Sequence, residues 1–259
     1  MSSKVFVRLL FWEFKKGFRV PVIEIISLLA LYVLFSSAIQ FSSSKMNVGE
    51  IRLDVYESFS ESLAMTLGFS FLSLYNVMSI VYPVLVANSF AGEFSRGETR
   101  LVFSYPLRRR DIFLAKTISF LFVPYLIFLI YALFMFYLVG FSFTRFIPYI
   151  FIISLIVGFL QAFFIFSLSL IMALYVKDAA ISFLASVLLL YGLDYASRGV
   201  NPPIKYFIPP RCFEFVFMSM AGRMSMFSGY FPYVASMYII MSLLFFIGSF
   251  FYFCKVMEV

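Results

Sequence analysis

The sequence predicts an all-α membrane protein with six transmembrane helices, an N-terminal interfacial amphipathic helix, and both termini in the cytoplasm. Of its 259 residues, 63% are hydrophobic and only 13% are charged, whereas about a quarter of the residues in soluble domains are charged. A soluble domain of this length could not bury so much apolar surface. Long segments are apolar on all faces, as in residues 126–140, and do not alternate as barrel strands do. Helices satisfy their own backbone hydrogen bonds and are therefore the form expected in lipid.

The composition excludes several classes of function. A water-soluble enzyme and a water-soluble nucleic-acid binder are excluded by hydropathy, despite the net charge of +7. Histidine is absent, which removes the commonest general base and metal ligand. Cys212 and Cys254 are far apart and form neither a metal cluster nor a disulfide framework. Neither a secretory signal peptide nor a phosphate-binding loop is recognisable, so we expect no catalytic, metal or cofactor site in this chain.

Residues 4–19 are predicted to form an amphipathic helix in the membrane interface. At 100° per residue, Lys4, Arg8, Lys15 and Arg19 fall within an arc of about 60°. The opposite side is apolar and holds Phe6, Val7, Leu10, Phe14 and Phe18. Such a helix lies flat, with its basic residues among anionic headgroups. The alternative is a plain basic anchor that sets only the topology.

Six segments are long and apolar enough to cross the bilayer as helices. They are residues 21–41, 63–90, 117–141, 147–176, 179–196 and 233–254. Their ends place about thirteen Lys and Arg residues on one side of the membrane and about seven on the other. The richer side, which includes both termini, is predicted to be cytoplasmic. The chain is therefore expected to be a single transmembrane domain, residues 1–259, in the cell membrane.

The cytoplasmic segment 91–116, between the second and third spans, is the most patterned part of the chain. Glu93, Arg96 and Arg100 are spaced to form ion pairs on one side of a short helix. Gly97 permits close backbone approach, and Pro106 ends this first short helix. Asp111 is placed to start a second short helix at its positive end. Three consecutive arginines lie between the two helices: Arg108, Arg109 and Arg110.

The segment 197–232, on the outer side, holds five prolines and an apolar Met-rich stretch. Short re-entrant helices and a simple outer cap are both consistent with it. Asn76, Asn88 and Asp194 are the polar residues proposed for a substrate path. The alternative for Asn76 and Asn88 is hydrogen bonding between helices. The alternative for Asp194, and for Glu24, is a structural role near the membrane interface.

The order of these parts resembles the permease subunits of type-2 ABC exporters. The likeness extends to residues of the cytoplasmic segment. The matching positions are Glu93, Gly97, Leu101, Pro106, Leu107, Arg109, Asp111, Ile112 and Lys116. Three positions depart from the family pattern: Glu98 stands in place of Thr, Arg108 in place of Ser, and Ala115 in place of Gly.

The resemblance implies a division of labour between chains. In such exporters the segment 91–116 would be the coupling loop that sits in a groove of a separate ABC ATPase. A pair of ATPase subunits would bind ATP and Mg, and a second permease chain, identical or related, would complete the path. The residues that the resemblance assigns to ATPase coupling are Glu93, Arg96, Gly97, Arg100, Leu101, Pro106, Arg108, Arg109, Arg110, Asp111 and Lys116.

Other functions remain open from the sequence. An ATP-independent secondary carrier, or a structural or sensory membrane protein, would need no ATPase and would tolerate charge reversal at the three arginines. A membrane-embedded enzyme is disfavoured because histidine and a mid-membrane Asp pair are missing. The aromatic-rich spans suggest an apolar or amphipathic substrate, although lipid-facing Phe is the simpler account of the 38 Phe residues.

Overall fold

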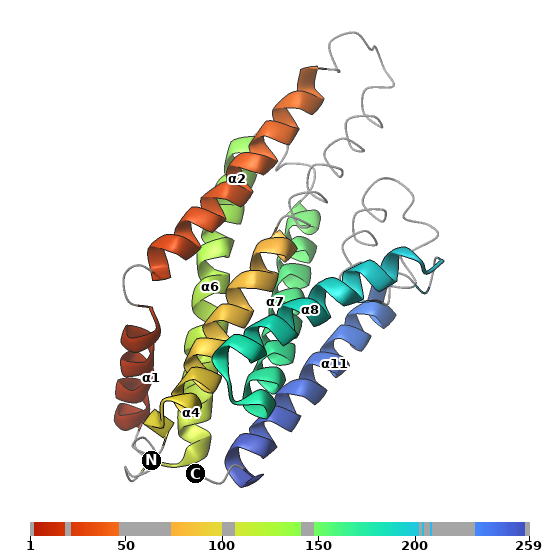
Figure 1. Ribbon diagram of the computed structural model, residues 1–259. Helices are drawn as coiled ribbons and strands as arrows, with labels where there is room; N and C mark the ends of the chain where they lie inside the picture. The colour runs from red at the N-terminus through yellow and green to blue at the C-terminus, as the bar shows by residue number, and fades with distance from the viewer. Residues whose placement is uncertain are drawn as a thin grey trace.

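The computed structural model describes residues 3–18, 22–46, 74–99, 107–140, 148–201, 204, 208 and 231–256, and all regular elements in these ranges are helices. The elements are α1 (Ser3–Gly17), α2 (Val22–Met46), η1 (Ala87–Ala91), α4 (Gly92–Ser95), α6 (Arg109–Gly140), α7 (Pro148–Val176), α8 (Ala179–Arg198), α11 (Phe231–Phe251) and η4 (Tyr252–Val256). Figure 1 shows them as one elongated bundle, with α1, α4 and η4 at the same end. We call this the charged end.

Five helices in the described ranges are long and apolar enough to cross a membrane. They are Leu74–Ser95, Arg109–Ile130, Gly158–Val176, Ala179–Arg198 and Pro232–Lys255. The predicted all-helical class is therefore confirmed, and the chain is a multi-pass membrane protein by the length and composition of its helices. Residues 22–41 of the remaining predicted span, 21–41, belong to the single helix α2, whose apolar described part is Val22–Val33.

The third span begins earlier than the sequence predicted. A separate short helix was expected from Asp111, followed by a span from residue 117. Instead α6 is one continuous helix from Arg109 to Gly140, with Asp111 in its first turn. Neither Gly nor Pro occurs in residues 111–117, and Ile112, Phe113 and Lys116 are already buried there. The prediction of two short helices is wrong in this respect, because the second one is the start of the span.

The span Leu74–Ser95 lies at the centre of the bundle. It continues from an α-helix through the π-helical turn η1 into α4. α1 and α2 pack against α6, while η1 packs against α7 and α8, and α7 also packs against α11. Hydroxyl groups fix the span laterally: Tyr75 Oη donates to the Leu190 carbonyl at 3.3 Å, and Tyr82 Oη donates to the Leu121 carbonyl at 3.0 Å.

Buried and partly buried phenylalanines join α6 to the C-terminal helix near the charged end. The ring of Phe113 lies 5.4 Å from the rings of Phe250 and Phe253 and 5.6 Å from that of Phe246. Its distance to Phe90 of η1 is 6.1 Å. Tilted and edge-on pairs at such distances stabilise a packed core. Part of the phenylalanine content therefore packs inside the bundle, so lipid-facing Phe is not its whole explanation.

Candidate functional site

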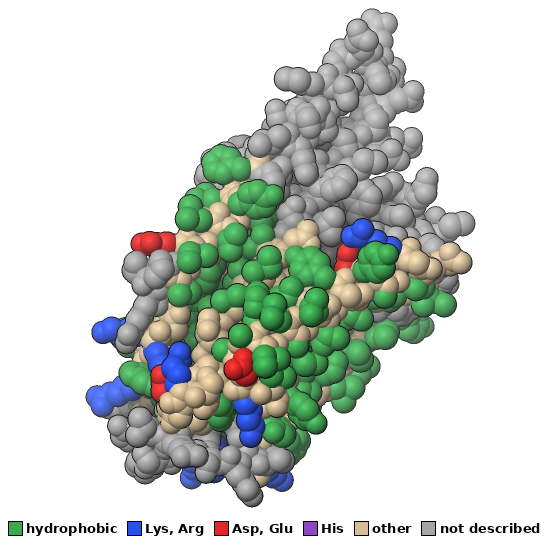
Figure 2. Space-filling model, viewed as in Figure 1, with side chains coloured by type: hydrophobic (Ala, Val, Ile, Leu, Met, Phe, Trp, Pro, Cys, Tyr) green, Lys and Arg blue, Asp and Glu red, His purple; other side chains and the backbone are tan. Residues whose placement is uncertain are grey.

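Six charged side chains gather where the second span ends at the charged end. Three are acids and three are bases: Glu13, Glu93, Glu98, Lys16, Arg96 and Lys116. We call this set the ion-pair cluster. Its members come from α1, from α4 and the turn that follows it, and from α6. In Figure 2, charged side chains gather at the lower end, while hydrophobic ones cover the helices above.

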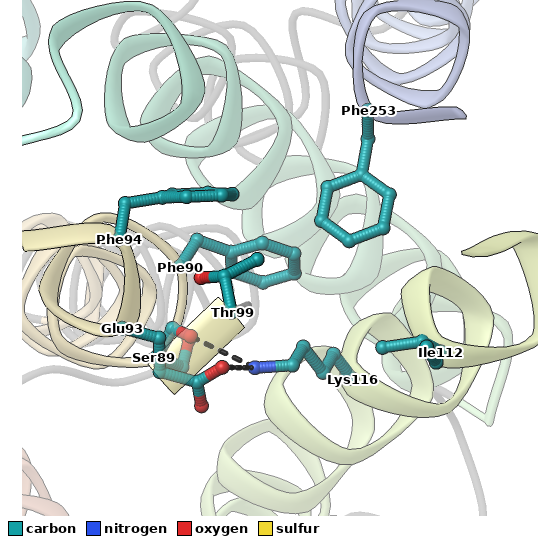
Figure 3. Close-up of a pocket in the computed structure, with 8 residues that line it drawn as sticks. All are labelled: Ser89, Phe90, Glu93, Phe94, Thr99, Ile112, Lys116 and Phe253. Carbon is teal, nitrogen blue, oxygen red and sulfur yellow. Dashed lines mark hydrogen bonds and ion pairs between the residues drawn. The ribbon is translucent and has the colours of Figure 1, made fainter. Parts of the chain in front are cut away.

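Lys116 is the buried centre of the cluster, with only 2% of its surface exposed. Its Nζ donates to Glu93 Oε2 at 2.5 Å and to the Ser89 carbonyl at 2.9 Å, as Figure 3 shows. The same nitrogen lies 3.8 Å from Glu13 Oε2 and 5.4 Å from the centre of the Phe90 ring. Because Ser89 and Phe90 belong to η1, Lys116 ties α6 to the π turn of the second span.

Glu13 brings α1 to the same centre. The residue is 1% exposed, and burial raises the pKa of its carboxyl, while the positive charge of Lys116 partly offsets this rise. Glu13 Oε1 is buried and has no hydrogen-bond partner among the residues that the structure describes. Oε2 of the carboxyl therefore faces Lys116, while Oε1 can still accept a hydrogen bond.

The outer half of the cluster is partly exposed. Lys16 Nζ donates to Glu98 Oε2 at 2.7 Å and to Glu93 Oε1 at 3.0 Å. Burial lowers the pKa of Lys16, but its hydrogen bonds to the two carboxylates outweigh this effect, and the net shift is upward. The hydrogen bond from Lys16 lowers the pKa of Glu98, whose Oε1 also lies 2.8 Å from Arg96 Nε. Both shifts favour the charged forms that hold the cluster together.

The cluster positions segments more than it adds stability. Burying ions is costly, and a buried pair often gives no more stability than apolar side chains of the same shape. Removing one partner leaves an unpaired buried charge and costs about 3–5 kcal/mol. The geometry is therefore specific: Glu93 stays bonded only when α1, the end of the second span and α6 keep their places.

Two glycines shape this end of the molecule for different reasons. Gly97 follows the last turn of α4 with φ of +72°, and its N–H donates to the Phe94 carbonyl at 3.0 Å, which ends the helix. No group of the described residues approaches Gly97 closely, since a Cβ there would meet nothing within 4 Å. Close approach occurs at Gly17, where a Cβ would lie 2.4 Å from the ring of Phe120.

The residues predicted for ATPase coupling divide into buried and exposed groups. Glu93 and Lys116 are buried, Arg108 and Arg110 are exposed, and Arg109 is half-buried. Arg100, Leu101 and Pro106 lie outside the described residues. The ion pair expected between Glu93 and Arg96 is wrong: Glu93 turns inward to the two lysines, since burial inside the bundle leaves it within reach of Lys116.

The predicted basic face of α1 is exposed at Arg8 and Lys15. The side chains of Lys4 and Arg19 lie outside the described part of the chain. On the predicted apolar side Val7 is 62% exposed, while Leu9 and Glu13, which were not assigned to it, are buried. The reason is that α1 packs one narrow face against α6 and leaves a second apolar strip outside the bundle.

The residues proposed for a substrate path lie on two helices. Asn76 and Asn88 are exposed on the second span, about 18 Å apart along its axis. Asp194 Oδ2 on α8 accepts a hydrogen bond from Arg198 Nη2 at 2.9 Å. The outer segment 197–232 lies mostly outside the described residues, so both of its expected forms, re-entrant helices and an outer cap, stay predictions.

Sequence reasoning missed Glu13 and did not assign Lys16 to the site. A signal was present for Glu13, which lies between Phe6 and Leu9 in helical projection and is therefore an acid on the apolar side of a basic helix. Its partner Lys116 is more than a hundred residues away in sequence, and no local pattern connects the two.

The comparisons with known proteins leave this geometry as the main guide to function. No family model matches the sequence, and no curated protein matches it. Within the described residues, no group of three or more His, Cys, Asp or Glu side chains could hold a metal ion. The arrangement is suited to mechanical linkage: charged side chains connect α1, the central span and the start of the next span.

Proposed function

We propose that this chain is the membrane-spanning permease subunit of an ATP-driven ABC exporter that works with a separate ATPase chain. The observation that carries the proposal is the junction between the second and third spans. There, exposed arginines stand beside a buried ion-pair cluster that joins α1, α4 and α6. A partner that binds the arginines would act directly on two spans.

The connection between surface and spans is short. Arg108 and Arg110 stand at the start of α6, and Lys116 follows within about two helical turns. Lys116 in turn holds Glu93 and the π turn of the central span. A force applied at the arginines would therefore move the start of α6 and the end of the second span as one body. Rigid-body motion of this kind suits alternating access.

The partner expected for this surface is a cytoplasmic ATPase with an acidic groove. Arginine forms strong charge-assisted hydrogen bonds with carboxylates, and complementary charge directs docking. A pair of ATPase subunits would bind ATP and Mg, and a second permease chain would complete the transport path. An apolar or amphipathic substrate is consistent with the aromatic spans.

The test is co-purification of the tagged chain from its native membrane in mild detergent, with bound proteins identified by mass spectrometry. The variant is Arg108→Glu with Arg110→Glu, which leaves the half-buried Arg109 intact. The matched control is Lys177→Glu with Lys255→Glu, two exposed lysines with the same total charge change. We expect an ATPase to co-purify with the native chain and the control, and to fall by about tenfold or more with the variant, since charged contacts at an interface are worth more than about 1.5 kcal/mol.

Recovery of the native chain without an ATPase would contradict the proposal. Equal loss in the variant and the control would also contradict it, because the effect would then follow total charge and not the arginine surface. An ATP-independent carrier or a structural membrane protein would become the better description.

A further inference from the structure

An apolar groove with one charged end lies between α1, α2 and the central span. Its cavity has a volume of about 270 Å3. The apolar part is lined by α2 and the span, including Ile25, Ile26, Leu29, Ile80, Val81 and Val84. The charged part is lined by Glu13, Lys16, Glu93 and Arg96 of the ion-pair cluster. Ile25 and Ile80 are both exposed large hydrophobic residues, so the groove opens at the outside of the bundle.

The length of the groove matches one leaflet of a bilayer. Glu93 and Ile80 are thirteen residues apart in the same helical span, which corresponds to about 20 Å along its axis. Half of the hydrocarbon core of a bilayer is about 15 Å. The charged end therefore lies at the depth of lipid headgroups when the apolar part lies beside acyl chains.

The charges at the groove end sum to zero. The three carboxylates of the cluster balance its three cations, so no net charge attracts a simple cation or anion. Side chains of both signs nevertheless line this end of the groove. The carboxyl of Glu13 is buried, and its Oε1 has no hydrogen-bond partner in the described part of the chain. Arg96 is more than half exposed and uses Nε for Glu98, and a guanidinium has further N–H donors.

We propose that this groove binds one membrane phospholipid whose zwitterionic headgroup carries a primary ammonium, as in phosphatidylethanolamine. On binding, the Glu13 carboxyl turns to bring Oε1 from the interior to the groove, where it accepts from the ammonium. The phosphate accepts from Arg96, and one acyl chain lies along α2 and the central span. The cavity is slightly smaller than typical small-molecule pockets of roughly 300–1,000 Å3. It therefore holds the headgroup side and the upper part of one chain, and the rest of the lipid stays in the bilayer.

Other headgroups fit this end less well. A choline headgroup has the same phosphate and net charge but no N–H to donate to Glu13. An anionic headgroup without an ammonium leaves Glu13 Oε1 without a donor, and the neutral cluster gives no compensating attraction. Comparing ethanolamine with choline lipids therefore isolates the ammonium hydrogen bond, and comparing both with an anionic lipid isolates net charge. Acyl-chain packing is the same in all three.

The test is the lipid composition retained by the full chain. The chain is reconstituted in nanodiscs of equal parts phosphatidylethanolamine, phosphatidylcholine and phosphatidylglycerol with identical acyl chains. Lipids that stay bound after gentle detergent extraction are counted by native mass spectrometry. We expect phosphatidylethanolamine to be enriched by about tenfold over each competitor, which is the factor that one charge-assisted hydrogen bond supplies.

Two variants test separately the contact with the lipid headgroup and the contact with the acyl chain. Glu13→Gln keeps the shape and removes the charge, so enrichment should fall to the composition of the nanodisc. Val84→Trp fills the apolar part without touching the cluster and should reduce retention of all lipids. The control Leu188→Trp adds the same side chain at an exposed position of α8 and should change neither.

Retention without preference in the native chain would overturn the proposal, as would a preference for phosphatidylglycerol. Unchanged enrichment in both Glu13→Gln and Val84→Trp would place the bound lipid elsewhere and would also overturn it. The inference requires only that the chain spans a membrane and does not rest on an ATPase partner. Its failure and the failure of the exporter proposal are therefore separate results.

Discussion

The second span and the last two spans differ in what surrounds them. For Leu74–Ser95, 72% of the apolar window is buried inside the molecule, against 17% for Ala179–Arg198 and 22% for Pro232–Lys255. Yet the buried span has the lowest mean hydropathy of the three, 1.4 against 1.6 and 2.1. The helix at the centre can be more polar because neighbouring helices satisfy its polar groups, whereas the outer helices meet mainly lipid or a partner.

The same contrast separates two sets of charges. At the charged end, Glu93 and Lys116 are buried and bond to groups from distant parts of the chain. On α8, Asp194 pairs with Arg198 one turn away, and the arginine side chain is 64% exposed. We therefore expect substitutions in the first set to disturb the fold and substitutions in the second to be tolerated.

The largest effect is expected for Lys116→Met. This change leaves the buried carboxylates of Glu93 and Glu13 without their central cation, and it should lower the free energy of unfolding by about 3–5 kcal/mol. Thermal unfolding of the purified chain in detergent measures the loss. Lys15→Met, at an exposed position of α1, is the control and should stay within about 0.5 kcal/mol of the native chain. Equal stability of the two variants would show that the ion-pair cluster does not stabilise the fold.

The sequence predicted the parts of this fold that depend on local pattern. Hydropathy located the spans, and the predicted segments 147–176 and 179–196 agree closely with α7 and α8. The turn between them is also local, since Asp178 accepts a hydrogen bond from the Ile181 N–H at 2.9 Å and caps α8. Patterns within one or two turns of helix are enough for such features.

The ion-pair cluster could not be predicted in the same way. Its central contacts join Glu13, Glu93 and Lys116, which come from three segments whose packing is set by the whole bundle. The π turn Ala87–Ala91 likewise has no marker in its residues, which are small or apolar apart from Asn88 and Ser89. The helical spacing within residues 91–116 gave Glu93 a neighbour in sequence as partner, whereas tertiary packing supplies Lys116 and Lys16.

A medium effect is expected where helices touch most closely. Gly17→Ala places a methyl group against the ring of Phe120. This ring is buried and lies 5.5 Å from the tilted ring of Phe18, so it cannot move aside freely. We expect a loss of about 1–3 kcal/mol in the free energy of unfolding. The matched control is Gly192→Ala in α8, where a Cβ meets nothing within 4 Å. It should raise stability by up to about 1 kcal/mol, because alanine favours the helix.

The opposite order, with Gly192→Ala more harmful than Gly17→Ala, would mean that α8 is covered by another chain and that α1 is held loosely. The comparison between the central and outer helices would then be wrong. Unfolding is then measured in detergent and in lipid nanodiscs at several protein concentrations. An effect that depends on protein concentration indicates a covering partner chain, and one that does not indicates a covering lipid.

The smallest effect is expected for Arg198→Ala on α8. The pair with Asp194 spans one helical turn and is exposed on the arginine side, and such pairs contribute about 0.3–0.5 kcal/mol. Raising the salt concentration should reduce even this difference, since exposed charges are screened. Thermal unfolding at low and high salt measures both. A loss as large as that of Lys116→Met, persisting at high salt, would instead show that Asp194 works in a dry environment, and the outer end of α8 would then join the charged end as a site where a buried acid depends on one cation.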